Sequence, residues 1–326
     1  MTDLSSLAAA SCSPTPEAGF FEQYEEVSLQ SCDVPMTLSI WKAQKDAPNL
    51  VFYPGTMLSP LLYSELLHRL REYGFNVLGI HHLSHGNSPR IKKTFTFQNL
   101  LQNGKDAVSY VQERFTGRVV LAGHSQGGIL SLAQAGQDER LSVVFPFCFL
   151  LPERPEAIEV TRLRHFAAQR ERLLKLLMRA AAYMPRFPVV IPMYLELKRI
   201  FAGGYGWSVK NRLRGARLSY PLAYLASLFS TNLDYLTQAG NIRCPVLCMV
   251  AEDDALFTPQ FMGDTLHHIQ APHKELIIMP GGGHMAPLSP QGALEYAAVV
   301  YERCAALGLF PRTLEPQGMP WITQVA

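Results

Sequence analysis

A serine stands among glycines in the segment Gly123-His-Ser-Gln-Gly127. The apolar residues 119–122 before it predict a buried strand, and Gly127 and Gly128 open a predicted helix. Where a strand turns sharply into a helix, the turn raises a serine hydroxyl above the edge of the sheet. Glycines suit the neighbouring positions because a Cβ atom there would collide with backbone. Short patterns of this kind also arise by chance, but the strand and helix around this one favour Ser125 as a nucleophile.

A serine hydroxyl attacks well only when a base removes its proton, and histidine is the usual base. His284 follows the glycines 281–283, just after the predicted strand 275–279. Glycines let such a loop approach the nucleophile closely, so we predict His284 as the base; a histidine that only packs within its loop is the alternative. The remaining histidines of interest are predicted to be surface or packing residues (His81, His82, His85, His267 and His268) or to point away from the nucleophile (His124).

The base needs an acid to orient it, and after this kind of turn the expected order along the chain is serine, acid, histidine. The acidic cluster Glu252-Asp-Asp254 follows the apolar run 246–250. It therefore lies at the carboxyl end of a predicted strand, where α/β sheets bind their ligands. We predict Asp254 as the acid, with Asp253 as a close alternative and Glu153 as a weaker one.

Attack on a carbonyl group develops negative charge on its oxygen, and backbone N–H groups fixed in advance stabilise that charge. The N–H of Gln126, directly after the nucleophile, is one predicted donor. The turn after the strand 49–53 is predicted to supply the second donor, from Thr56 or Met57. In each case the N–H group matters more than the side chain.

Strands and helices alternate along the chain, which predicts an α/β fold with a mostly parallel central sheet flanked by helices. The expected strands are a hairpin over 24–30 and 34–43, then 49–53, 75–80, 119–122, 141–151, 246–250 and 275–279. The alternation stops at Pro152, and a helical stripe of apolar residues runs through 157–184. The predicted parts are an irregular N-terminal arm (1–23), the α/β core (24–151 and 241–307), an inserted helical cap (152–240) and a C-terminal tail (308–326).

The predicted cap is strongly basic. Residues 152–220 hold fourteen Lys and Arg against five Glu and no Asp, a net charge of +9. A solvated basic face explains this charge without any ligand. The alternative is that the cap meets an anionic membrane surface or a phosphate-bearing carrier.

Composition narrows the function classes. The net charge of +2 is too small to favour nucleic acid as a partner, and no apolar run reaches the roughly 20 residues that span a bilayer. The six cysteines show no metal-binding spacing and resemble buried apolar residues of a reducing compartment, so we expect a cytoplasmic protein without a metal. No cofactor is expected either.

At this point the chain resembles the α/β-hydrolase serine esterases that carry a helical lid, such as monoacylglycerol lipases and lysophospholipases. The resemblance covers residues 45–307. The segment Gly123–Gly127 matches the family pattern fully, Ala251–Asp254 resembles its G-x-x-D acid turn, and Gly283-His284 with Pro287 resembles its histidine loop. The segment His81–Ser88 resembles a D-x-x-G-H-G-x-S loop in which His81 replaces Asp and Ser84 replaces Gly. Pro54-Gly55 stands where the family usually has His-Gly, so the subfamily and the substrate stay open.

These residues together predict a serine hydrolase that cleaves a carboxylic ester with a lipid-like or other apolar acyl group, through an acyl-Ser125 intermediate. The apolar side chains of the cap favour such a substrate over a sugar or a peptide. Thioester cleavage or acyl transfer would use the same residues. An alternative of another class is a ligand-binding receptor that keeps the fold without catalysis.

Overall fold

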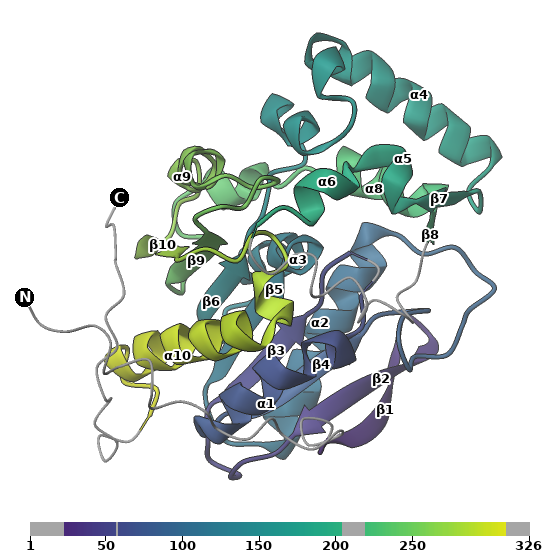
Figure 1. The fold of residues 1–326 in the computed structure, drawn as a ribbon. Coiled ribbons are helices and arrows are strands. Elements are labelled where there is room, and N and C mark those ends of the chain that lie inside the picture. Colours follow the sequence, from purple (N-terminus) through teal and green to yellow (C-terminus); the bar gives the residue numbers. More distant parts are fainter. Residues whose placement is uncertain (1–22, 57, 204–218, 311–326) are drawn as a thin grey trace, which may run out of the picture.

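The protein is described by a computed structural model that covers residues 23–56, 58–203 and 219–310. Nearly all of the predicted N-terminal arm and most of the predicted C-terminal tail lie outside these residues. An eight-stranded sheet forms the centre of the fold (Figure 1). Its strands in chain order are β1 (Glu25–Ser31), β2 (Val34–Trp41), β3 (Asn49–Tyr53), β4 (Asn76–His81), β5 (Val119–His124), β6 (Leu141–Phe147), β9 (Val246–Ala251) and β10 (Lys274–Met279).

The sheet has the order β1-β2-β4-β3-β5-β6-β9-β10. The hairpin β1–β2 and the pair β2–β4 are antiparallel, and all other neighbours are parallel. Every residue of β3, β5 and β9 is buried, as expected for parallel strands covered on both faces. The predicted mostly parallel sheet is therefore confirmed.

Helices cover both faces of the sheet (Figure 1). Because parallel crossovers are right-handed, a change of direction across the sheet places the connecting helix on the other face. The crossover from β3 to β4 runs opposite to those from β4 to β5 and from β5 to β6, so α1 lies opposite α2 and α3. The core helices are α1 (Ser64–Glu72), α2 (Phe97–Arg114), α3 (Gln126–Ala135), α9 (Pro259–His267) and α10 (Pro290–Ala306), with the 3₁₀ turns η2 (Pro60–Tyr63) and η7 (Ala286–Leu288).

Residues 152–203 and 219–240 form the elements between β6 and β9 that the structure describes, and we call them the cap segment. In Figure 1 they lie beyond the edge of the sheet at which the parallel strands end. Their elements are the 3₁₀ helices η3 (Pro155–Val160), η4 (Arg164–Gln169) and η6 (Asp234–Thr237), the helices α4 (Arg170–Tyr183), α5 (Ile191–Tyr194), α6 (Leu197–Ile200) and α8 (Leu222–Ser230), and the short strands β7 (Pro188–Val190) and β8 (Ser219–Pro221). The first residue of α2 ties the cap to the core, since the N–H of Phe97 donates to Ser227 Oγ on α8 (2.8 Å).

Two predicted elements are wrong in detail. The stripe over 157–184 is three helical pieces instead of one helix. Thr161 ends the first piece, because its hydroxyl donates to the Ile158 carbonyl and accepts from the N–H of Leu163, which competes with helical hydrogen bonding. The predicted strand 141–151 ends at Phe147, where Cys148 has a φ of 64° that turns the chain out of the sheet. The remaining apolar residues of the predicted strand, 149–151, are buried although they are not part of a strand.

A helix that spans a membrane must be long and apolar enough to cross the bilayer. Over the described residues, no helix combines the length and the apolar character that a bilayer requires.

Candidate active site

Ser125 occupies the turn between β5 and α3. Its backbone angles are φ 56° and ψ −115°, a left-handed conformation that costs a non-glycine residue roughly 1–3 kcal/mol. The surrounding structure holds it there, since the N–H of Ser125 donates to the Phe147 carbonyl on the neighbouring strand (2.8 Å). The residue is half-buried, whereas the residues on both sides of it are fully buried. The turn therefore leaves the nucleophile candidate open to a substrate.

The glycines around Ser125 are required by close backbone contacts. A Cβ atom on Gly123 would lie 2.2 Å from the carbonyl oxygen of Gly127. A Cβ atom on Gly127 would lie 2.1 Å from the carbonyl oxygen of Tyr53, at the end of β3. Any larger residue would push the helix α3 away from the strands and open the turn.

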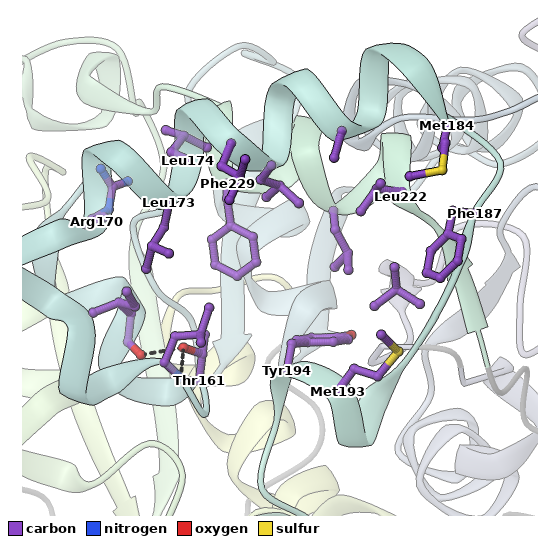
Figure 2. Close-up of a pocket in the computed structure, with 17 residues that line it drawn as sticks. Thr161, Arg170, Leu173, Leu174, Met184, Phe187, Met193, Tyr194, Leu222 and Phe229 are labelled. Atoms are coloured by element: carbon purple, nitrogen blue, oxygen red, sulfur yellow. Dashed lines mark hydrogen bonds between the residues drawn. The ribbon is translucent and has the colours of Figure 1, made fainter.

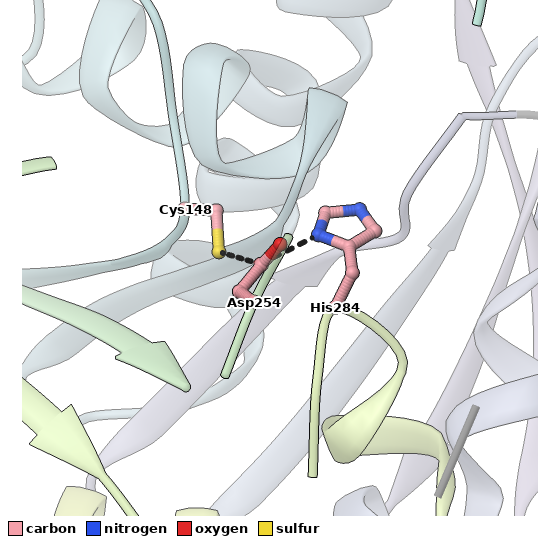
Figure 3. Close-up of side chains that lie close together, drawn as sticks. All are labelled: Cys148, Asp254 and His284. Atoms are coloured by element: carbon pink, nitrogen blue, oxygen red, sulfur yellow. Dashed lines mark hydrogen bonds and ion pairs between the residues drawn. The ribbon is translucent and has the colours of Figure 1, made fainter. Parts of the chain in front are cut away.

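Asp254 and His284 meet at the carboxyl ends of β9 and β10. The Nδ1 of His284 lies 2.9 Å from Oδ2 of Asp254 (Figure 3). Both residues are buried, with exposed fractions of 1% for Asp254 and 5% for His284. A carboxylate only accepts hydrogen bonds, so Nδ1 carries the proton and Nε2 is the nitrogen left to accept one. This is the tautomer that a base for Ser125 needs.

The carboxylate of Asp254 is held from several sides. Its Oδ1 accepts from the N–H groups of Leu256 (2.7 Å) and Phe257 (2.8 Å). Burial by itself would raise the pKa of Asp254, but attraction to His284 and these hydrogen bonds hold the pKa below its usual value. Asp254 therefore stays ionised and can stabilise a positive charge on the imidazole.

The two alternative acids have other positions. Asp253 accepts a hydrogen bond from the N–H of Gly283 (2.6 Å), so its carboxylate binds the backbone of the histidine loop instead of the ring. Glu153 forms no hydrogen bond with His284 in the described part of the chain, and burial raises its pKa. Of the three carboxylates that the sequence left open, the structure brings Asp254 to the imidazole.

Cys148 also reaches this site. Its Sγ lies 3.4 Å from Oδ2 of Asp254, and ligand atoms of Cys148, Asp254 and His284 all lie within 4.8 Å of one another (Figure 3). Such a group resembles a metal site, but a cysteine binds metal as a thiolate. Burial raises the pKa of Cys148 well above its usual value, which keeps the thiol protonated and able to donate to Asp254. In this arrangement the thiol is a further hydrogen-bond donor to the carboxylate that faces His284.

His124, the residue before Ser125, links three loops of the site. Its Nε2 lies 2.9 Å from the carbonyl oxygen of His284, so this nitrogen carries the proton. Its Nδ1 then accepts from the hydroxyl of Tyr63 (2.7 Å), whose oxygen accepts from the N–H of Gly55 (3.1 Å). Burial lowers the pKa of His124 to about 3, so the ring stays neutral. The chain of bonds connects the turn after β3, the turn after β5 and the histidine loop.

This contact also places Ser125 near His284, because the neighbour of the serine touches the backbone of the histidine. Among the described residues, no hydrogen bond joins the Ser125 hydroxyl to the imidazole. Catalytic hydrogen bonds are often long in the absence of substrate and shorten in the complex.

The predicted oxyanion donors fall into two groups. Gln126 is the first residue of α3, where an N–H has no partner within the helix, and neither it nor the N–H of Thr56 forms a hydrogen bond in the described chain. Met57 lies outside the described residues. The side chain of Gln126 is 3% exposed, and neither its oxygen nor its nitrogen has a hydrogen-bond partner in the described part of the chain.

Sequence reasoning missed three residues of this site. Tyr63 and Cys148 carried no motif. His124 was predicted only to point away from the nucleophile, whereas its ring packs against the ring of His284 (centroids 4.8 Å apart) and bonds to the His284 backbone. The histidines at the end of β4 (His81) and in the loop that follows it (His82 and His85) are buried packing residues, as expected, and His267 is exposed on α9.

Comparisons of sequence show the family. A sequence profile of the alpha/beta hydrolase family matches residues 50–298. A 79-residue stretch is 33% identical to a protein of Mycobacterium phage D29 named "Putative non-heme haloperoxidase". That stretch covers 24% of this chain and only 27% of the phage protein, so the local match carries no activity over.

Comparisons of structure show the same fold. The chain is similar to the monoacylglycerol lipase of Paleococcus ferrophilus, with 17% identity and a TM-score of 0.64 over 83% of this chain and 99% of that one. It is similar to a soluble variant of the monoglyceride lipase of Saccharomyces cerevisiae, with 14% identity and a TM-score of 0.66 over 87% and 95%. A thermophilic esterase from Thermogutta terrifontis gives 19% identity and a TM-score of 0.60 over 87% and 99%. The profile match over residues 50–298 covers most of the sheet and includes Ser125, Asp254 and His284. The chain therefore belongs to the alpha/beta hydrolase family.

Proposed function

We propose that the protein is a serine hydrolase that cleaves carboxylic esters with an apolar acyl group. The observation that carries this proposal is the buried hydrogen bond between Asp254 and His284, beside the turn that holds Ser125. A buried, oriented imidazole next to a half-buried serine is the arrangement that activates a hydroxyl.

In the proposed reaction Ser125 Oγ attacks the ester carbonyl while His284 Nε2 takes the hydroxyl proton. The N–H of Gln126 and an N–H of the 55–57 turn stabilise the oxyanion. Collapse of the tetrahedral intermediate leaves acyl-Ser125, and His284 gives its proton to the departing alcohol. Water then attacks the acyl group by the same route, and the acid leaves. Asp254 keeps its charge throughout and stabilises the imidazolium.

Labelling with a fluorophosphonate tests the nucleophile. We expect the wild type to be labelled, Ser125→Ala to lose the label, and Ser230→Ala, an exposed serine of α8, to keep it. A folded wild type that stays unlabelled would favour the receptor alternative. Esters and thioesters with the same acyl chain, offered with and without an alcohol acceptor, then separate ester cleavage from thioester cleavage and acyl transfer.

We also propose that the cap segment meets an anionic membrane surface. Support comes from the outward face of α4, where the exposed cations Arg172, Lys175 and Arg179 share the helix face with Tyr183 (87% exposed). Mixed basic and apolar groups on one helix face suit the interface of an anionic bilayer.

Sedimentation with phosphatidylserine vesicles tests this partner. Changing the three cations to Gln should abolish cosedimentation while hydrolysis of a short soluble ester is retained. Binding that survives the triple change, or that favours a phosphate-bearing carrier over vesicles, would contradict the membrane proposal. The cytoplasmic location expected from the cysteines stays a prediction.

A further inference from the structure

The cap segment contains an apolar cavity of about 450 Å³. Figure 2 shows the 17 residues that line it, which all lie between Ile158 and Phe229 and come mainly from α4, α5 and α8. None of them is Ser125, Asp254 or His284. The cavity is therefore a feature of the cap itself, and its volume is in the range of ligand-binding pockets.

The walls of the cavity are incompletely covered. Helix α4 turns leucines toward the cavity, yet Ala181 is its one buried residue. Phe187 is 46% exposed and Met193 is 55% exposed, although both line the cavity. Apolar surface left in water costs about 25 cal/mol for each Å², so a hydrocarbon chain that covers these side chains gains free energy on binding.

The polar groups of the cavity select the ligand. The hydroxyl of Thr161 is already satisfied by Ile158 and Leu163. Arg170 is the one charged residue among those that line the cavity. Its Nη2 donates to the Pro152 carbonyl, which fixes the side chain, whereas its Nε and Nη1 have no acceptor within the described residues. A fixed guanidinium with free donors fits a carboxylate.

The position of Arg170 gives the cavity a direction. Arg170 lies at one end in Figure 2, and Met184 and Phe187 lie at the other. Arg170 and Met184 stand fourteen positions apart along α4 and its end, which corresponds to about 21 Å at 1.5 Å per residue. An acyl chain in one leaflet of a bilayer spans about 15 Å, half of the hydrocarbon core of roughly 30 Å, which is less than this length. The cavity therefore has room for one long chain with its head group at Arg170.

We propose that the cap cavity binds one long-chain fatty acid anion, with its carboxylate on Arg170 and its chain along α4, apart from the catalytic centre. This goes beyond the proposed function: the acid is the product that the proposed hydrolase would release, but its binding does not require hydrolysis. The same chain chemistry could also come from an uncharged ester, which offers the apolar chain without the carboxylate.

Calorimetric titration of palmitate, kept below its micelle concentration, into the full-length Ser125→Ala variant tests the site. We expect Arg170→Gln to weaken palmitate binding at least about tenfold and to leave methyl palmitate binding unchanged. Ala180→Trp, which fills the cavity, should abolish both. Arg172→Gln, on the outward face of α4, is the matched control and should bind palmitate like the parent.

Two further measurements keep the result decisive. Thermal unfolding and circular dichroism verify that each variant folds. Wild-type protein with Ser125 capped by a small phosphonate should still bind palmitate. Loss of palmitate binding on capping, or unchanged palmitate binding in either Arg170→Gln or Ala180→Trp, would overturn the proposal. Because the titration uses Ser125→Ala, its outcome is independent of whether the wild type hydrolyses esters.

Discussion

Neighbouring carboxylates at the end of β9 have separate tasks. Asp254 accepts from the imidazole of His284, whereas Asp253 accepts from the N–H of Gly283, one residue earlier in the same loop. One therefore sets the charge and orientation of the ring, and the other sets the position of the loop that carries the ring. Two adjacent residues after β9 therefore hold two adjacent residues after β10: Asp254 holds the side chain of His284, and Asp253 holds the backbone of Gly283.

The two aspartates should differ when each is changed to asparagine. Asp254→Asn replaces the carboxylate with an uncharged amide, which no longer fixes the proton on Nδ1 of His284. We therefore expect kcat for ester hydrolysis to fall by about 10⁴, the loss known for this change in a serine protease triad. Asp253→Asn keeps a side-chain oxygen that can accept from Gly283, so we expect a loss of less than about tenfold. Equal losses in steady-state kinetics would contradict this division of tasks.

Gln126 has a buried amide whose two polar atoms lack partners in the described chain. An unsatisfied buried group costs about 1–3 kcal/mol, so Gln126→Leu should raise the free energy of unfolding by a similar amount. Catalysis should persist, because the predicted oxyanion donor is the backbone N–H. Urea denaturation measures the stability.

Gln134 is the matched control on the same helix. Its oxygen accepts from the Tyr53 hydroxyl, and its nitrogen donates to Asp138 (2.8 Å). Gln134→Leu should therefore destabilise the protein. A loss of stability in both variants would show that Gln126 has a partner in solution.

At the scale of elements, the loops after β3, β5, β9 and β10 supply the site, and hydrogen bonds join them across the edge of the sheet. The 3₁₀ turn η2 contributes Tyr63, which connects the N–H of Gly55 with His124. His124 in turn donates to the backbone of His284. The position of the turn after β3 relative to the loop of His284 therefore depends on one phenol and one neutral imidazole.

Tyr63→Phe removes both bonds of this phenol and leaves Nδ1 of His124 buried without a donor. We expect kcat to fall about tenfold while KM for a short ester stays unchanged, together with a destabilisation of about 1–3 kcal/mol. Tyr110→Phe, on α2 away from the site, is the control. A wild-type kcat in Tyr63→Phe would show that the turn after β3 keeps its place without the link.

For the whole molecule, burial of neutral histidines makes stability depend on pH. Burial lowers the pKa of His81 to about 4 and of His82 to about 3, and His124 has a pKa of about 3. An unfolded chain would protonate the same residues near their usual value of about 6.5. As the pH falls below 6.5, the unfolded state binds more protons than the folded state, so stability is lost.

We expect the free energy of unfolding to decrease by about 1.4 kcal/mol per pH unit for each of these histidines between pH 6 and pH 4.5. Urea midpoints across this range measure the slope. His82→Phe should reduce this slope by the contribution of one histidine. His267→Gln, at an exposed position, should leave the slope unchanged. A midpoint that does not move between pH 7 and pH 4.5 would show that the rings are already protonated in the folded protein.

Local patterns in the sequence were sufficient for the sheet and for the turn at Ser125. The runs 50–53 and 246–251 are apolar throughout because parallel strands are buried on both faces, and that signal is local. The glycines around Ser125 mark close backbone contacts in the same way. The pieces of 157–184 were harder to predict, because the hydroxyl of Thr161 competes with the helix and an apolar stripe does not register that competition.

Pairings between distant residues depended on the tertiary structure alone. Asp253 and Asp254 are chemically identical, and only the geometry of the loops after β9 and β10 decides which carboxylate meets the imidazole. Tyr63, Cys148 and His124 take part in the site because strand ends far apart in sequence lie side by side at one edge of the sheet. Hydrogen bonds depend on distance and direction in space, which residue types and spacing along the chain do not specify.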